Sequence, residues 1–148
     1  MALQAERSIG MVTMCYALLE PDSNTLRMAN AGYNYPLLLN ETIQEISLPG
    51  LPLGIDDSIE FDEVAIKIEP GTSVKFYTDG VPETRDREGN LYTFERFKAA
   101  VQTKRWLNPV DMVAKLLAEI TQYTQDAPER QHNHPGLAIF TSNWQNRQ

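Results

Sequence analysis

The sequence has few of the features that mark secreted, membrane-embedded or nucleic-acid-binding proteins. It holds one cysteine, Cys15, so no internal disulfide or thiolate metal cluster can form within one chain. Thirteen Lys and Arg against twenty Asp and Glu give a net charge of −7, which disfavours nucleic acid and anionic membrane surfaces as partners. The longest apolar run, Met11–Leu19, is far shorter than the roughly 20 residues that span a bilayer. We therefore expect a soluble, cytoplasmic protein.

Common catalytic motifs are also absent from the sequence. There is no Gly-rich phosphate loop and no Gly-x-Ser-x-Gly nucleophile elbow. Nothing cationic flanks Cys15, so a buried and unreactive thiol fits that residue better than a nucleophile does.

What the chain does contain is enough apolar sequence for one domain. Its 148 residues are 42% hydrophobic, and we expect a single domain over residues 1–148, with no linker. Strand patterns come first and helix patterns later, which predicts an α+β fold. The pattern predicts a short helix over residues 2–8, strands over 11–19 (buried on both faces), 25–29, 36–39, 43–48, 61–68 and 74–78, helices over 94–104 and 109–123, and a last strand over 136–141.

One carboxylate has a plausible place in a site. Asp79 follows the apolar segment Val74–Thr78, so a rigid strand would present its side chain at the rim of a sheet. Hard divalent ions such as Mg²⁺ or Mn²⁺ prefer oxygen ligands of this kind. Asp followed by Gly is also the commonest hairpin-turn signal. Both interpretations, a metal ligand and a tight turn, remain open from spacing alone.

Two further polar groups are candidate sites. His132 and His134 would share a face of an extended segment and could chelate a transition metal, but no third ligand is identifiable. A polar loop before the last strand is the simpler interpretation. An acidic group between positions 56 and 63 is typical of a solvated loop and strand edge, where like charges discourage edge-to-edge pairing. It consists of Asp56, Asp57, Glu60, Asp62 and Glu63.

Five short motifs occur in a fixed order along the chain. They are Met11-Val-Thr-Met-Cys-Tyr16, Ala29-Asn-Ala-Gly-Tyr-Asn-Tyr-Pro-Leu-Leu38, Leu51-Pro-Leu-Gly54, Glu69-Pro-Gly71 and Phe76-Tyr-Thr-Asp-Gly-Val-Pro-Glu83. In this order the chain resembles the metal-dependent serine/threonine phosphatases of the sporulation stage II E type. These form the bacterial branch of the PPM (PP2C-like) family, which includes the stress-response phosphatases of partner-switching pathways. The segments Glu88–Tyr92 and Phe94–Phe97 also resemble the family's continuation.

The resemblance implies a fold, a reaction and a partner. The fold would be a layered β-sandwich of two sheets with helices on the outside. Two Mn²⁺ or Mg²⁺ ions would activate a water that attacks phosphorus, without a side-chain nucleophile. The substrates would be phosphoserine or phosphothreonine on a regulatory protein such as an anti-sigma-factor antagonist.

The metal ligands implied by the resemblance are mostly missing. The family has three separated acidic positions, and only one of them is an acid here, Asp79. An early Gly-Asp-rich motif is absent, so the chain resembles only the C-terminal part of the domain. Asn133 and His134 stand where an Asp-Asp pair precedes the last strand. Asn133 offers a carbonyl oxygen without charge, so the predicted ligands are Asp79 and Asn133.

Two expectations follow from these departures. One carboxylate cannot balance two divalent ions, so metal binding should be weak and the isolated chain impaired or inactive as an enzyme. The alternative is a degenerate phosphatase-like module that binds a signalling partner without hydrolysis. The missing front part would also leave a bare sheet edge or apolar face, which predicts self-association into a homo-oligomer.

Overall fold

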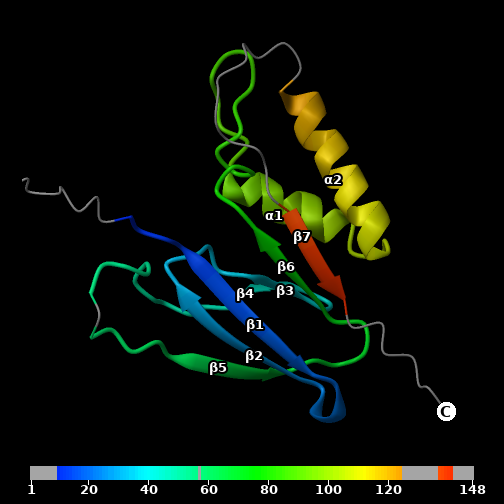
Figure 1. The fold of residues 1–148 in the computed structure, drawn as a ribbon. Helices are drawn as coiled ribbons and strands as arrows, with labels where there is room; N and C mark the ends of the chain where they lie inside the picture. Colours follow the sequence, from blue (N-terminus) through cyan, green and yellow to red (C-terminus); the bar gives the residue numbers. More distant parts are fainter. Residues whose placement is uncertain (1–9, 57, 125–136, 142–148) are drawn as a thin grey trace, which may run out of the picture. The chain divides into compact units, whose positions relative to one another are not determined.

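The computed structural model describes residues 10–56, 58–124 and 137–141. In these ranges, six strands and a short 3₁₀ helix precede two α-helices and a last strand (Figure 1), which confirms the predicted α+β class. The helix predicted over residues 2–8 lies outside the described residues. The elements are β1 (Met14–Glu20), η1 (Pro21–Ser23), β2 (Thr25–Ala31), β3 (Leu37–Leu39), β4 (Ile43–Glu45), β5 (Glu63–Lys67), β6 (Ser73–Tyr77), α1 (Phe94–Thr103), α2 (Pro109–Tyr123) and β7 (Leu137–Thr141).

Strands β1, β2 and β5 form an antiparallel sheet in that order. The predicted turn after β1 is present: η1 begins with a proline, and Asn24 adopts φ 47°, a left-handed conformation that Asn tolerates. This tight connection pairs Glu20 with Thr25 and sets the register up to Met14 opposite Ala31. One face of β2 is buried through Leu26 and Met28.

The prediction that residues 11–19 are buried on both faces is wrong. Strand β1 begins at Met14 and stands at an edge of its sheet. The side chains of Met14, Tyr16 and Leu18 are 46%, 53% and 45% exposed. An apolar run shows that a segment can be buried, but it does not show that another element covers it. Cys15 is half-buried, and burial raises the pKa of its thiol, in line with an unreactive group.

The second antiparallel sheet has the order β4, β3, β6, β7, and α1 and α2 pack on one face of it. Leu37 and Leu39 of β3 and Tyr77 of β6 belong to the same apolar cluster as the helices' buried residues. These helical residues are Phe97, Ala100 and Val101 of α1 and Met112, Leu116 and Ile120 of α2. The cluster holds β6 rigidly up to its last residue.

Lys75 is a charged residue inside this sheet, and the sequence patterns did not single it out. It lies opposite Leu37 on β6, it is fully buried, and its ammonium donates a hydrogen bond to the Ser73 hydroxyl. Side chains alternate along a strand, so Lys75 shares the helix-covered face with Tyr77. Burial lowers the pKa of Lys75 to about 8.

Helix α2 has the predicted bounds, because its start signals are unambiguous. The Asn108 side chain accepts a hydrogen bond from the Asp111 N–H at 2.9 Å, and Pro109 occupies the first turn. Helix α1 begins in the same way after Thr93, whose hydroxyl accepts from the Arg96 N–H. Both caps satisfy N–H groups that a helix leaves free at its start.

The chain forms two compact units. One consists of the residues up to Tyr33 together with Leu48–Lys67, and the other consists of Asn34–Ser47 and the residues from Ile68 onward. The first contains the sheet of β1, β2 and β5, and the second contains the other sheet and both helices. The expectation of a single domain stays a prediction. Neither described helix is both long and apolar enough to cross a membrane.

Candidate metal centre

Asp79 lies in a turn directly after β6, as the apolar strand pattern predicted. The turn is closed by a hydrogen bond from the Val81 N–H to the Thr78 carbonyl, at 3.1 Å. A second bond runs from the Glu83 N–H to the carbonyl of Asp79 itself, at 3.0 Å. The Asp79 residue is exposed, whereas the next residues, Gly80 and Val81, are buried. The backbone of this acid is therefore fixed while its carboxylate faces solvent.

Neighbouring side chains hold the turn in place. Before it, the Tyr77 ring contacts Phe94 and Phe97 of α1, with ring centroids 5.8 and 5.0 Å apart. After it, the Thr84 hydroxyl donates to the Gly80 carbonyl at 2.6 Å. The Asn34 amide donates to the Tyr77 carbonyl at 3.4 Å. Asn34 belongs to the motif Ala29–Leu38, but the motif alone does not predict this contact.

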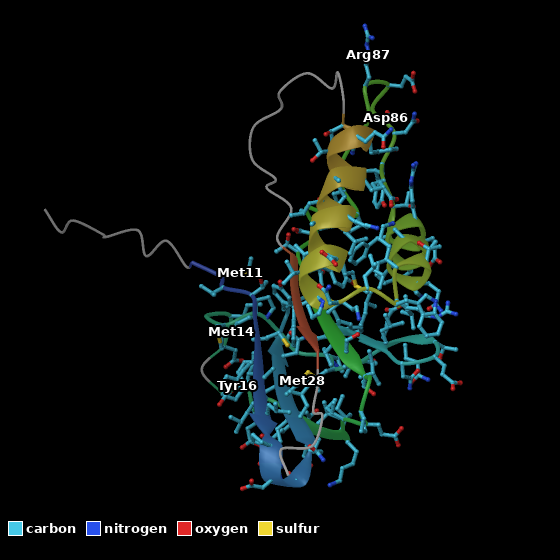
Figure 2. The ribbon with its side chains drawn as sticks, turned by 90° about the vertical axis from the view of Figure 1, so that its right-hand side faces the viewer. Met11, Met14, Tyr16, Met28, Asp86 and Arg87 are labelled. Carbon is cyan, nitrogen blue, oxygen red and sulfur yellow. The ribbon has the colours of Figure 1, made fainter. Side chains whose placement is uncertain are left out.

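The loop after the turn, residues 84–92, is anchored on the helices. Arg85 pairs with Leu91 in an antiparallel bridge, and the loop tip carries Asp86 and Arg87 (Figure 2). Tyr92 closes the loop, is almost fully buried and donates from its hydroxyl to Glu119 of α2 at 2.6 Å. The family-like segment Glu88–Tyr92 thus has a structural role, because it ties the residues after Asp79 to α2.

The hydrogen-bond partners of Glu119 favour the charged form of its carboxylate. Burial raises the pKa of a carboxyl, but hydrogen bonds from the Lys104 ammonium and the Tyr92 hydroxyl outweigh it and lower the pKa of Glu119. Burial and the bond to Glu119 raise the pKa of Tyr92. The Arg96 guanidinium lies over the rings of Tyr92 and Tyr123, 5.0 and 4.5 Å from their centroids.

In the first unit, residues of the motif Ala29–Leu38 lie close to residues of the motif Leu51–Gly54 and of the segment just before it. The buried Asn30 amide donates to the carbonyls of Tyr33 and Leu48, at 2.9 and 2.7 Å. A Cβ on Gly50 would lie 1.8 Å from the Asn30 carbonyl oxygen, and one on Gly32 would lie 2.7 Å from the Pro52 ring. Gly32 also has φ +71°, which glycine adopts most easily. Gly50 and Gly32 therefore allow two segments of the chain to approach closely.

The other candidate ligands are either outside the described residues or exposed. Asn133, His132 and His134 lie outside the described residues. In the acidic group, Asp57 is not described, the other members are exposed, and Glu63 is paired with Arg27 at 2.8 Å. Within residues 10–56, 58–124 and 137–141, no three His, Cys, Asp or Glu side chains gather where they could hold a metal. One carboxylate does not fit a binuclear centre, because its charge leaves two divalent ions largely unbalanced.

Solved structures of similar fold are PP2C-like phosphatase domains. The SiaA-PP2C domain of Pseudomonas aeruginosa matches 86% of this chain and 50% of its own, with a TM-score of 0.71 and 13% identity. The SpoIIE phosphatase domain of Bacillus subtilis matches 92% and 59%, with a TM-score of 0.68 and 10% identity. The RsbU and RsbW domains of Rv1364c from Mycobacterium tuberculosis match 86% and 34%, with a TM-score of 0.66 and 22% identity.

The family follows from the sequence. The model described as Stage II sporulation protein E (SpoIIE) matches residues 1–130, so the chain belongs to this family, and the predicted resemblance is confirmed. No curated protein matches the chain. The chain spans between about a third and three fifths of the length of the three solved structures above.

Proposed function

We propose that the chain acts as the C-terminal part of a phosphatase domain that hydrolyses phosphoserine or phosphothreonine on a regulatory protein. The observation that carries this proposal is Asp79, an exposed carboxylate on a fixed turn in a chain of the SpoIIE family. The resemblance to stress-response phosphatases supports a phosphoprotein such as an anti-sigma-factor antagonist as the partner. A cytoplasmic location belongs to the same proposal.

The proposed metal ligands are Asp79 and Asn133, with Mn²⁺ or Mg²⁺ as the ion. In PPM-type phosphatases such ions supply the activation of water. Among the described residues no three potential ligand side chains gather into a metal site, so the isolated chain should bind these ions weakly and hydrolyse little. The alternative, a binding module without hydrolysis, rests on Asn133, and no observation on the described residues favours it.

The test measures metal binding and hydrolysis together. Titration with Mn²⁺ and hydrolysis of p-nitrophenyl phosphate are compared for the wild type, Asp79→Asn and Asp62→Asn. Asp62 is the matched control, because it is also exposed and its replacement removes the same charge. We expect Asp79→Asn to reduce Mn²⁺ binding and any hydrolysis to background, and Asp62→Asn to leave both unchanged.

The outcomes separate the parts of the proposal. Equal Mn²⁺ binding by the wild type and Asp79→Asn would exclude Asp79 as a ligand. Asn133→Asp should strengthen Mn²⁺ binding, because it restores a charged oxygen. If that variant gains no affinity, Asn133 is not a ligand position, or the absent front motif limits binding by itself.

A further inference from the structure

The segment directly after the candidate metal ligand, residues 80–84, is held by backbone from further along the chain, and we call this segment the stem. The Tyr92 N–H donates to the Thr84 carbonyl at 2.7 Å, and the Thr93 N–H donates to the Pro82 carbonyl at 2.9 Å. These bonds add a second attachment to those of the turn itself. The position of the stem therefore depends on where Tyr92 and Thr93 lie.

The Tyr92 side chain extends this attachment to both helices. It is almost fully buried, and its hydroxyl donates to one carboxylate oxygen of Glu119 in α2 at 2.6 Å. The Lys104 ammonium, directly after α1, donates to the other oxygen of the same carboxylate. Hydrogen bonds to charged groups are stronger than those between neutral groups. Through one carboxylate, Glu119 thus joins the end of α1, the body of α2 and the residue that holds the stem.

From these contacts we propose that Tyr92 and Glu119 are positioning residues for the Asp79 carboxylate. Both act through the stem, which begins one residue after Asp79 and includes Glu83, whose N–H donates to the Asp79 carbonyl at 3.0 Å. A shift of α2 against α1 moves the acceptor of the Tyr92 hydroxyl and, with it, the turn. The packing of the two helices thus controls where the carboxylate lies. Asp79 binds the metal in the proposed function, on which this inference rests.

A second tyrosine anchors the same loop at a different place. Tyr123, the last residue of α2, donates from its hydroxyl to the carbonyls of Asn90 and Leu91, at 3.1 and 3.0 Å. These carbonyls belong to the loop and not to the stem. The two tyrosine hydroxyls can therefore be compared directly, because both join α2 to the loop while Tyr92 is the one whose backbone holds the stem.

The experiment is amide hydrogen exchange of the full chain, followed residue by residue by nuclear magnetic resonance. The reporters are the N–H groups of Val81 and Glu83, which close the turn. Tyr92→Phe removes only the hydroxyl and should speed exchange at both groups by roughly tenfold, because a hydrogen bond to a charged group is lost. Tyr123→Phe is the matched control and should leave both groups as protected as in the wild type.

Glu119 provides a rescue test. Glu119→Gln keeps an oxygen that can accept from the Tyr92 hydroxyl and should retain most of the protection, whereas Glu119→Ala should match Tyr92→Phe. Exchange at the Leu116 N–H, in the middle of α2, reports a general loss of stability. Three results would overturn the inference: exchange at Leu116 that rises as much as at the turn, equal effects of Tyr92→Phe and Tyr123→Phe, or a Glu119→Gln variant no better protected than Glu119→Ala.

Mn²⁺ titration connects the link to the proposed function. Tyr92→Phe should weaken Mn²⁺ binding, and Tyr123→Phe should not. If Asp79→Asn weakens Mn²⁺ binding but Tyr92→Phe does not, the turn does not position the ligand and the inference is wrong. If Asp79→Asn leaves Mn²⁺ binding unchanged while the exchange results hold, the proposed function fails and the link between the helices and the turn stands.

Discussion

The two sheets of this protein have similar apolar strands but meet their surroundings differently. Leu37, Leu39 and Tyr77 lie on a face that α1 and α2 cover, and all three are buried. On the other sheet, Met14 and Leu18 of β1 share one face, called the outer face, and both are about half exposed. The strands are similar in composition, and what differs is the burial of their side chains. Buried apolar contacts should therefore dominate the stability of the helix-covered sheet. The contacts on the outer face should contribute less, because solvent weakens them.

The largest expected effect tests the helix-covered side of this comparison. Leu116 of α2 is fully buried in the apolar cluster. Leu116→Ala should lower the free energy of unfolding by about 2–5 kcal/mol, because it removes buried apolar surface and leaves a cavity. Urea denaturation followed by circular dichroism measures the change.

The neighbouring residue supplies the matched control. Leu117 belongs to the same helix but is 36% exposed, and Leu117→Ala changes helix propensity by the same amount. We expect it to cost less than about 1 kcal/mol. If both substitutions destabilise equally, the helix does not bury the face that we describe, and the comparison between the two sheets fails.

The second prediction concerns Lys75, a charged side chain buried on the helix-covered face. The folded state lowers the pKa of Lys75 from 10.5 to about 8, so the unfolded chain holds its proton more tightly between these values. The free energy of unfolding should therefore rise with pH from about 8 to 10.5. Lys75→Met should remove this rise and stabilise the protein near neutral pH by up to about 3 kcal/mol.

The pH dependence separates this cause from a general packing effect. Lys67→Met, at an exposed lysine of β5, is the control and should leave the rise with pH intact. Urea midpoints at several pH values between 7 and 11 provide the measurement, with the window taken from the lysine pKa values. A wild type whose stability is flat across this range would show that Lys75 keeps its ordinary pKa.

Much of the fold was predictable because local signals determine it. Asn108 and Pro109 mark the start of α2, and one proline followed by three small polar residues at positions 21–24 marks the turn after β1. Burial was not predictable in the same way. Met11–Leu19 is rich enough in apolar residues for a central strand, yet β1 is an edge. Lys75 is charged, yet it is buried. Both depend on what another part of the chain covers.

At the candidate site too, local features were predictable and long-range contacts were not. The strand pattern and the motif placed Asp79 at the end of β6, and the structure has it there. The contact of Asn34 with the backbone of Tyr77 joins residues 43 positions apart, so no local spacing reveals it. Asn133 as a ligand stays a prediction. Sequence therefore locates a carboxylate on a strand, but long-range packing decides which groups surround it.

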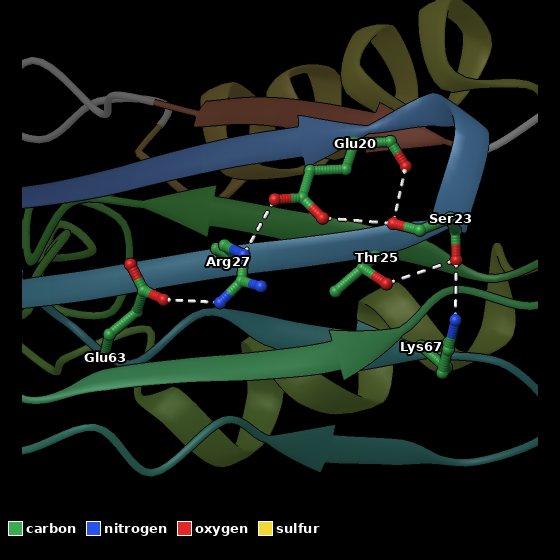
Figure 3. A network of polar contacts seen from close by, with 6 residues as sticks. All are labelled: Glu20, Ser23, Thr25, Arg27, Glu63 and Lys67. Atoms are coloured by element: carbon green, nitrogen blue, oxygen red, sulfur yellow. Dashed lines mark hydrogen bonds and ion pairs between the residues drawn. The ribbon is translucent and has the colours of Figure 1, made fainter.

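The smallest expected effect tests the outer face. Arg27 donates to Glu20 at 2.7 Å and to Glu63 at 2.8 Å, within a polar network that includes Ser23, Thr25 and Lys67 (Figure 3). Hydrogen bonds from Arg27 and Ser23 lower the pKa of Glu20. Arg27→Ala should reduce the melting temperature slightly, because these exposed pairs are screened by water.

Salt and acid distinguish this loss from a loss of packing. In about 1 M salt the screening length falls to about 3 Å, so wild type and Arg27→Ala should melt together. A carboxyl whose pKa is lowered stabilises the fold above its unfolded value of 4.5, and this contribution disappears as the pH falls through the folded value. The deficit of Arg27→Ala should therefore also shrink in acid. The loss from Leu116→Ala should persist in high salt, because its cause is buried apolar surface. A deficit of Arg27→Ala that is equally insensitive to salt and acid would mean that the aliphatic stem of Arg27, rather than its charge, supports the outer face.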